Sequence, residues 1–431
     1  MKIVELNTSF SIRDFRQSWK KKQLIPKKIL KRVLDIIFDV QERGDEALKD
    51  YTLRFDQLDL NITGMEINQD EIEKAYTESK DFIPILEVAA QRIATFHRHG
   101  LPQSWFFTDH YGNILGQKIT PIEYLGVYCP GGKAAYPSTV LMNVIPAQVA
   151  GVKKIIMCVP TPKGEISNLV LAAAKVSGIN KIFRLGGAQA IAAMAYGTET
   201  VPKVDFICGP GNIYVAAAKK LVFGEVGIDM VAGPSEIAII ADGSVSANWA
   251  AADLLSQAEH DEMARIFLIT PSQHYAHSVL KEIEKQLSFL PRKAIASEAL
   301  EKQGYIFIVP DLNSAAQVVN TIAPEHLELL IAEPLGFLEK IKHAGAIFLG
   351  PYAVEALGDY IAGPNHTLPT GGTARFSSVL SSEHFLKRSS LLFISPEGLS
   401  ALGPKAIKFA QAEGLIAHAT SVKKRLEESK D

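Results

Sequence analysis

The sequence has few cysteines and no means of pairing all of them. Its 431 residues include three, Cys129, Cys158 and Cys208. An odd number, lying in or beside apolar runs, excludes a fully paired disulfide framework and is typical of reduced thiols. Cys129 and Cys208 stand next to glycine turns, so a thiol nucleophile for aldehyde oxidation is an alternative. No histidine adjoins either one in sequence, and we favour a structural role for them.

The chain also lacks an excess of charge of one sign and any long apolar run. It has 45 Lys and Arg against 47 Asp and Glu, a formal net charge of −2, which gives no electrostatic reason for a nucleic-acid or anionic-membrane partner. The N-terminal segment has no extended apolar stretch, and apolar runs elsewhere are too short to span a bilayer. We therefore expect no nucleic acid, no membrane and a cytoplasmic location.

A third absence is the Gly-x-Gly-x-x-Gly fingerprint of standard dinucleotide-binding folds. In its place, glycine turns at 126–132, 186–190 and 209–212 each precede a helical stretch. Unpaired N–H groups and the helix dipole favour phosphate at such positions. From the residues alone, nucleotide binding and simple turn glycines both remain open.

Short apolar runs alternate with small-residue helical segments from residue 123 onward. The first series has predicted strands at 124–128, 154–159, 181–185 and 204–208 and helices at 168–176, 188–196 and 213–221. The second has strands at 236–241, 265–270, 305–309 and 346–349 and helices at 247–260, 272–288 and 313–321. This alternation predicts the α/β class, with two incomplete Rossmann-like parallel-sheet units and helical N-terminal and C-terminal extensions.

Gln257 and His260 are three residues apart on a predicted helix, so an oxygen and an imidazole nitrogen leave the same face. This is half of a metal site, although from the pair alone a capped helix end is the favoured explanation, since an amide is an uncommon zinc ligand. Of the eleven histidines, His260, His326, His366 and His418 lie in Gly-, Pro- or Glu-rich turns or at helix ends and are the functional candidates. The others are predicted to be surface residues: His97, His99, His110, His274, His277, His343 and His384.

Glu325 and His326 follow Pro324, a favourable first residue of a helix. Adjacent helical residues diverge by about 100°, so the two side chains suit two separate proton-transfer tasks. A helix-capping pair is the alternative. A tight turn at Gly233 and Pro234 is expected to leave Ser235 and Glu236 facing a cleft.

These motifs, in this order, resemble those of the histidinol dehydrogenases, and the resemblance covers almost the whole chain. It is carried by the stretches Val-Ala-Gly-Pro-Ser-Glu, Leu-Leu-Ser-Gln-Ala-Glu-His, Ala-Pro-Glu-His, Gly-Asp-Tyr, Gly-Pro-Asn-His and Ala-Glu-Gly-Leu-Ile-Ala-His. The resemblance implies oxidation of L-histidinol to L-histidine through L-histidinal, in histidine biosynthesis, with zinc and two NAD⁺.

The resemblance also implies roles for individual residues. His326 is expected to be the general base in the oxidation steps, and Glu325 the base that activates water. The implied zinc ligands are Gln257, His260, Asp359 and His418; the implied NAD contacts are Tyr128, Gln189 and Asn212; the implied substrate contacts are Ser235, Gln257, His260, His326, Asp359, His366, Glu413 and His418. An oxygen and nitrogen shell is compatible with zinc.

A homodimer follows from the same resemblance, with the tail of each chain completing the partner's site. The expected domains are an N-terminal extension (1–26), a first α/β domain (27–125 with 237–370) that carries the metal ligands and proton carriers, an NAD-binding domain (126–236) and a C-terminal extension (371–431). Two rival interpretations remain: a zinc hydrolase in which the glycine turns are only structural, and a catalytically silent protein that binds an imidazole ligand.

Overall fold

The computed structural model describes residues 1–6, 25–131 and 136–428. The chain folds into two compact units: a main unit of Met1–Gly100 and Glu123–Phe385, and a small unit of Leu101–Ile122 and Leu386–Asp431. The small unit thus combines most of the expected C-terminal extension with an early segment that no sequence pattern joined to it. Most of the expected N-terminal extension, residues 7–24, lies outside the described residues.

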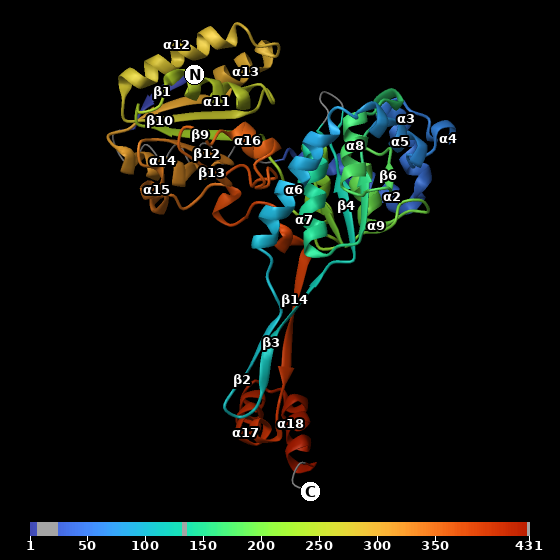
Figure 1. The fold of residues 1–431 in the computed structure, drawn as a ribbon. Coiled ribbons are helices and arrows are strands. Elements are labelled where there is room, and N and C mark those ends of the chain that lie inside the picture. Colours follow the sequence, from blue (N-terminus) through green and yellow to red (C-terminus); the bar gives the residue numbers. More distant parts are fainter. Residues whose placement is uncertain (7–24, 132–135, 429–431) are drawn as a thin grey trace. The chain divides into compact units, whose positions relative to one another are not determined.

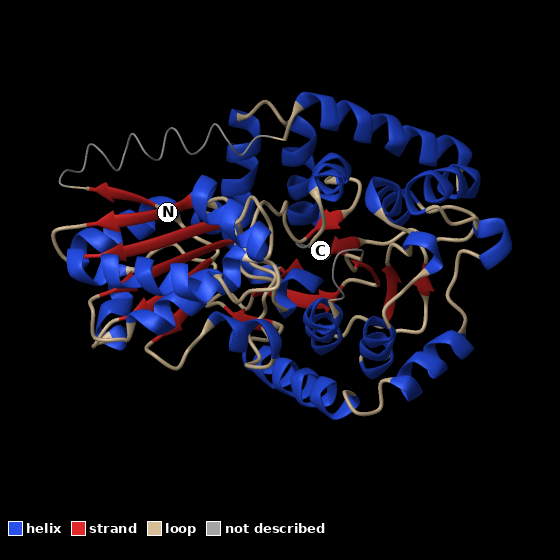
Figure 2. Ribbon diagram, turned by 90° about the horizontal axis from the view of Figure 1, so that it is seen from above, coloured by secondary structure: helices blue, strands red, loops and turns tan. Residues whose placement is uncertain are grey.

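The main unit contains a parallel sheet in the strand order β1-β11-β10-β9-β12-β13, six strands within the described residues (Figure 2). Its strands are β1 (Lys2–Glu5), β9 (Glu236–Ala241), β10 (Arg265–Thr270), β11 (Gly304–Ile308), β12 (His326–Leu330) and β13 (Ala346–Leu349). Every residue of β9, β10 and β12 is buried, as expected for central strands covered on both faces.

A second parallel sheet of the main unit, with five strands in the described segments, has the order β6-β5-β4-β7-β8. Its strands are β4 (Tyr124–Tyr128), β5 (Lys154–Cys158), β6 (Ile182–Phe183), β7 (Phe206–Cys208) and β8 (Gly227–Ile228). From β4 the chain proceeds to β5 and β6 on one side and later to β7 and β8 on the other. The direction of winding therefore switches between β4 and β7.

Helices cover both sheets (Figure 1). In the main unit they are α2 (Lys27–Arg43), α3 (Asp45–Asp56), α4 (Leu60–Thr63), α5 (Gln69–Glu78), α6 (Ile83–His99), α7 (Pro137–Ala150), α8 (Asn168–Val176), α9 (Gly187–Tyr196), α10 (Ile213–Val222), α11 (Ala247–Ala258), α12 (Gln273–Leu287), α13 (Lys293–Gln303), α14 (Leu312–Ile322), α15 (Pro334–Phe337) and α16 (Glu355–Tyr360). The fold class predicted from the sequence, two parallel-sheet α/β units, is confirmed.

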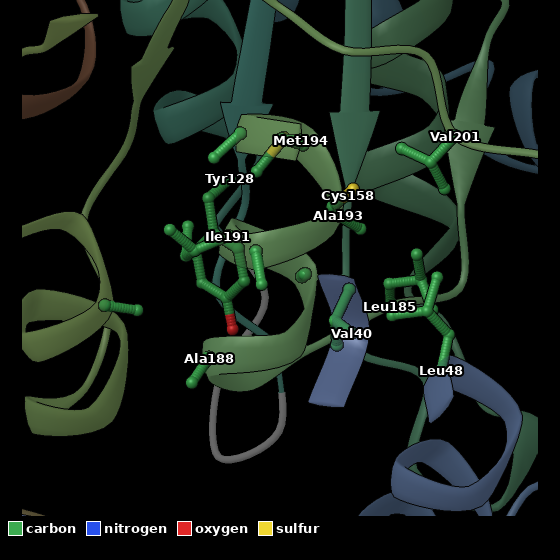
Figure 3. Packing of buried hydrophobic residues seen from close by; sticks show 14 of the residues in the cluster. Val40, Leu48, Tyr128, Cys158, Leu185, Ala188, Ile191, Ala193, Met194 and Val201 are labelled. Carbon is green, nitrogen blue, oxygen red and sulfur yellow. The ribbon is translucent and has the colours of Figure 1, made fainter. Parts of the chain in front are cut away.

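The helices α2 and α3 pack with the five-stranded sheet. Figure 3 shows Val40 and Leu48 in the same buried cluster as Leu185, Cys158 and Met194. The expected domain division instead grouped residues 27–125 with 237–370. An apolar helix face indicates that a helix is covered but not by which sheet, so the sequence pattern could not choose the partner.

The segment at His326 differs from the sequence prediction. Helix α14 ends before Ala323, which adopts a positive φ of 52°, and His326 is the first residue of strand β12, not part of a helix start. The apolar side chains of Leu327 and Leu329 are buried within the sheet. Burial on both faces favours the strand, and this outweighs the preference of Pro324 for a helix N-terminus.

The small unit contains an antiparallel sheet in the order β14-β3-β2. Its elements are β2 (Trp105–Thr108), β3 (Ile114–Pro121), β14 (Leu386–Phe393), α17 (Pro396–Ala412) and α18 (Ile416–Glu428). The sequence predicted only a helical C-terminal extension here, without a sheet. Over the described residues, no helix is long and apolar enough to cross a membrane.

Candidate active site

His326 lies buried at the start of β12, and its hydrogen bonding defines which nitrogen is available as a base. Nδ1 lies 3.0 Å from the carbonyl oxygen of Glu236. Because a carbonyl can only accept, Nδ1 carries the proton in the neutral ring. Nε2 is buried without a hydrogen-bond partner among the described residues and lies 3.6 Å from Asp359 Oδ1. In the neutral ring the lone pair is therefore on Nε2, the nitrogen that would accept a proton.

Carboxylates surround this imidazole. Glu355 Oε1 is 3.7 Å and Glu325 Oε2 3.8 Å from Nδ1. Burial alone would lower the pKa of His326, but Glu355, Glu325 and Asp359 outweigh it and raise the pKa well above 6.5. Burial raises the pKa of Glu325 to about 8 and that of Glu355 to about 7, although His326 opposes both shifts. The site therefore concentrates buried negative charge around one imidazole.

Glu325 is held by the backbone of the neighbouring strand. Its Oε2 accepts the N–H of Glu236 at 2.8 Å. The side chain of Glu236 is itself fully buried, in an ion pair of 2.7 Å with Arg265, and also accepts the N–H of Gly371 at 3.1 Å. The expectation that Glu236 faces a cleft is wrong: the arginine of the adjacent strand satisfies it inside the protein. Ser235, just before it, is half-buried.

Two predicted metal ligands lie at the end of α11. Gln257 is 1% exposed, and one end of its amide lies 3.1 Å from Glu355 Oε2. His260 follows the helix and is exposed, yet close enough to Asp359 and His326 for their charges to interact. Helix α11 follows β9 in the chain, so the C-terminal end of the helix returns to the end of the sheet at which β9 and β12 begin.

The donor atoms of this region fit a metal ion. Ligand atoms of His326, Glu355 and Asp359 all lie within 4.8 Å of one another. Imidazole nitrogen and carboxylate and amide oxygens suit Zn²⁺, and a divalent cation would offset the excess of buried carboxylates. Glu355 was missed by the sequence analysis. Its position four residues before Asp359, on the same helix face, is the signal that could have found it.

His366 is also held at this cluster. Its Nδ1 donates to the carbonyl oxygen of Asp359 at 3.0 Å. Burial lowers the pKa of His366, which favours the neutral imidazole. The structure thus brings Gln257, Asp359, His366 and the Glu325–His326 pair together at the end of the six-stranded sheet where β9 and β12 begin.

The three predicted NAD-contact residues follow different strands of the five-stranded sheet. Tyr128 ends β4, and its hydroxyl accepts the N–H of Gly187 at 3.1 Å. Gln189, on α9 after β6, is buried. Asn212 caps α10 by accepting the N–H groups of Tyr214 and Val215. Tyr128 and Asn212 therefore flank the switch point between β4 and β7, where open α/β sheets bind ligands.

A buried ion pair fixes the turn that precedes Asn212. Lys219 of α10 pairs with Asp229, with side chains 2% and 0% exposed. Lys219 Nζ donates to the carbonyl of Gly209 at 2.9 Å, and Asp229 Oδ2 accepts the N–H of Gly209 at 2.9 Å. Gly209 has a φ of 112°, and a Cβ there would meet Tyr128 O at 2.0 Å, so only glycine fits.

The cysteines support a structural role. Cys129, Cys158 and Cys208 are buried and unpaired in disulfides. Burial raises the pKa of Cys129 to about 12 and also raises that of Cys158 and Cys208. A thiol that stays protonated is a poor nucleophile.

Among the histidines expected at the surface, His97 is the exception. It is buried at 4% exposure on α6, because its helix presents the same face as Ile93 to the core. His343 and His384 are half-buried, and the remaining four are exposed: His99, His110, His274 and His277.

The remaining predicted residues, Glu413 and His418, belong to the small unit. Glu413 ends α17 and His418 lies on α18; both are exposed. They line the same surface hollow, together with Lys405, Phe409 and Leu415.

Comparisons with known proteins agree over the length of the chain. The family model described as histidinol dehydrogenase matches residues 19–426. The histidinol dehydrogenase of Geobacter sulfurreducens is 54% identical over 396 residues, 91% of this chain and 92% of the relative. That of Aquifex aeolicus is 54% identical over 407 residues, 94% of each. The crystal structure of histidinol dehydrogenase from Elizabethkingia anophelis is similar with a TM-score of 0.94 at 38% identity, covering 100% of this chain and 99% of that one.

Proposed function

The chain belongs to the histidinol dehydrogenase family, and from this premise we propose that it oxidises L-histidinol to L-histidine through L-histidinal, with zinc bound and two NAD⁺ reduced. The observation that carries the proposal is the buried imidazole of His326, whose unpartnered Nε2 lies among carboxylates. Histidine biosynthesis and a cytoplasmic location are parts of the same proposal.

In the first oxidation, His326 Nε2 takes the hydroxyl proton of histidinol while a hydride leaves the alcohol carbon for NAD⁺. The hydrogen bond from Nδ1 to the carbonyl of Glu236, 3.0 Å long, keeps the ring in the tautomer that this step requires. His326 then releases this proton to solvent, and once water has added to the aldehyde the same nitrogen accepts a hydroxyl proton of the hydrate as the second hydride leaves for a second NAD⁺. Each oxidation thus releases one proton to His326.

Glu325 is the proposed base that activates the water. A base works best when its pKa is near the working pH, and burial raises the pKa of Glu325 to about 8. Its contact with the backbone N–H of Glu236 at 2.8 Å leaves Oε1 to face the water. Because Glu325 and His326 occupy successive positions at the start of a strand, their side chains leave the backbone in different directions.

The proposed zinc ligands are Gln257, His260 and Asp359 of one chain with His418 of a partner chain. When bound, the ion would hold the amine and imidazole nitrogens of histidinol and so fix the reacting carbon. The protein's own groups complete the substrate site, and these we propose to be Ser235, Gln257, His260, His326, Asp359, His366, Glu413 and His418.

We propose that NAD⁺ contacts Tyr128, Gln189 and Asn212. The support is the position of Tyr128 and Asn212 after β4 and β7, on either side of the switch in winding direction, together with the glycine turn at Gly209. Gln189 follows Gly187, whose N–H donates to the Tyr128 hydroxyl. The Lys219–Asp229 pair holds this turn.

A homodimer that exchanges small units is part of the proposal. Large apolar side chains of the small unit are exposed, with Phe106 at 70%, Leu392 at 69% and Phe409 at 70%, and apolar surface of this kind favours a protein partner. Co-expression of His260→Ala and His418→Ala chains tests it. If His418 acts in the partner's site, half the dimers are mixed and have one intact site, so activity returns to roughly a quarter of wild type. If His418 acts in its own chain, the mixture stays inactive.

The experiment that tests the reaction is to supply histidinol and NAD⁺ and to follow NADH absorbance. The proposal expects two NADH per histidinol consumed, since each hydride transfer removes two electrons. A zinc hydrolase would form no NADH and would cleave an ester or amide instead. A silent binding protein would retain histidinol unchanged, and either result would contradict the proposal.

A further inference from the structure

Gln257 is an unusual candidate for a zinc ligand because its two amide atoms are chemically opposite. Only the oxygen can bind a metal ion, whereas the NH₂ group can only donate hydrogen bonds. The two orientations of an amide have nearly the same shape, so packing alone does not choose between them. A buried amide, 1% exposed, therefore needs a neighbour that distinguishes oxygen from nitrogen.

Glu355 is that neighbour. Its Oε2 lies 3.1 Å from one terminal atom of the Gln257 amide, and its Oε1 also contacts that atom. Both oxygens of Glu355 contact this amide end, and a carboxyl group carries at most one proton, so at least one of the two oxygens can only accept. The amide end at Glu355 is therefore the NH₂ group and the opposite end is the oxygen. The opposite end faces only hydrogen-bond donors, and an oxygen at that end can accept from them.

The position of Glu355 is itself fixed by its surroundings. The side chain is 2% exposed, and the backbone N–H donates to Glu328 Oε1 at 2.9 Å. Glu355 is the first residue of α16 and Asp359 lies one turn later on the same face. One short helix thus presents a proposed zinc ligand, Asp359, together with the carboxylate that contacts a second one, Gln257.

We propose that Glu355 is a positioning residue: it holds the Gln257 amide by its nitrogen so that the amide oxygen is directed to the metal. The inference rests on the proposed function, because it assumes that Gln257 binds the metal. Groups that orient metal ligands in this way change metal affinity by about 10- to 100-fold when they are replaced.

The test measures metal binding rather than turnover. Glu355→Gln replaces the carboxylate by an amide that can either donate to Gln257 or accept from it, so the orientation is no longer imposed. Zinc affinity is measured by competition with a chromophoric chelator, and the absorption spectrum of the cobalt-substituted protein reports the ligand set. We expect about 10- to 100-fold weaker zinc binding and an altered cobalt spectrum.

Two further variants separate orientation from charge and from damage to the fold. Glu328→Gln removes a buried carboxylate of the same cluster but keeps an oxygen that accepts the N–H of Glu355, so zinc affinity should stay close to wild type. The double variant Glu355→Gln, Gln257→Glu exchanges the two residues, so the amide at position 355 donates and the carboxylate at position 257 accepts. The second oxygen of the carboxylate at position 257 can then bind the metal. The exchanged protein should regain most of the lost zinc affinity.

The outcomes discriminate between explanations. Equal zinc affinity and an unchanged cobalt spectrum in Glu355→Gln would overturn the inference and leave the proposed function intact. If Glu355→Gln and Glu328→Gln lose zinc affinity equally, the loss is due to removal of buried charge. If the exchanged protein does not regain zinc affinity, the loss is due to structural damage. Either result would overturn the inference. A wild-type protein that takes up no zinc contradicts the proposed zinc dependence and the inference together.

Discussion

The burial of His97 predicts a specific pH dependence of stability. The side chain is 4% exposed, its Nε2 has no hydrogen-bond partner within the described part of the chain, and burial lowers its pKa from 6.5 to about 4. The folded protein therefore keeps the ring neutral between these values, whereas the unfolded chain takes up a proton. Because the unfolded state binds more protons, the free energy of unfolding decreases as the pH falls below 6.5.

The magnitude follows from the width of this interval. One pKa unit corresponds to about 1.36 kcal/mol, so the contribution of His97 is nearly complete at about pH 7.5 and has fallen by roughly 2 kcal/mol at pH 5. The loss is roughly 3 kcal/mol at pH 4 and approaches a limit of roughly 3.4 kcal/mol below about pH 3. Aspartate and glutamate residues also titrate in this range, and their effect has to be removed by comparison.

The comparison is between wild type and His97→Leu, which fills the buried position with an apolar side chain. Urea unfolding is measured at intervals from pH 7.5 to 5, and the difference between the two proteins at each pH isolates the histidine. The stability of His97→Leu relative to wild type should rise by roughly 2 kcal/mol as the pH falls through this range. His99→Leu, at an exposed position two residues later, should show no such trend. Parallel pH profiles for wild type and His97→Leu would show that protonation of His97 does not cause the loss of stability at low pH.

Two further predictions concern the catalytic pair and the turn at Gly209. Glu325→Gln should slow oxidation of histidinal by about 10²- to 10⁴-fold and oxidation of histidinol much less, whereas His326→Asn should slow both reactions. Single-turnover NADH formation from each substrate measures these rates. Equal losses of the two rates in Glu325→Gln would contradict the division of roles. Lys219→Met leaves Asp229 buried without its ammonium partner and should lower the free energy of unfolding by about 3 to 5 kcal/mol, as measured by urea unfolding. Recovery in the double variant with Asp229→Leu is expected, and a negligible loss in Lys219→Met would show that the pair is dispensable.

The sheets of the main unit could be predicted because their signal is local. Strands such as Glu236–Ala241 and Arg265–Thr270 are buried on both faces, so they are continuous apolar runs that stand out from the helices between them. The strand at His326–Leu330 was missed because a proline two residues earlier is typical of a helix start. The burial that decides in favour of a strand is a tertiary effect.

The sheet of the small unit could not be predicted in the same way. Strand β14 (Leu386–Phe393) pairs with β3 (Ile114–Pro121), which lies more than 260 residues earlier in the chain. Pairing over such a distance leaves no periodic pattern that joins the two segments. The exposed apolar side chains of β2 and β14 also show that these strands lack a buried face, which is the feature that produces a recognisable strand pattern.

The candidate site was only partly accessible from the sequence. Gln257, Asp359 and the Glu325–His326 pair were selected from motifs, whereas Glu355 belonged to none of these motifs. Its importance arises from contacts with Gln257 and His326, two residues from other elements. The four-residue spacing of Glu355 and Asp359 can be read from the sequence, but the place of their helix in the fold cannot.

In the proposed function, oxidation of histidinol requires a metal ion bound by Gln257, His260 and Asp359, and removal of the metal tests this requirement. The protein is treated with a chelator and measured for zinc content, far-ultraviolet circular dichroism and histidinol-dependent NADH formation. Because the ligands come from helices and strands that the hydrophobic cores already fix, we predict that activity disappears while the helical signal is retained, and that stoichiometric zinc restores activity. Full activity in the metal-free protein would show that the metal is not required, and global unfolding on chelation would show that its role is structural.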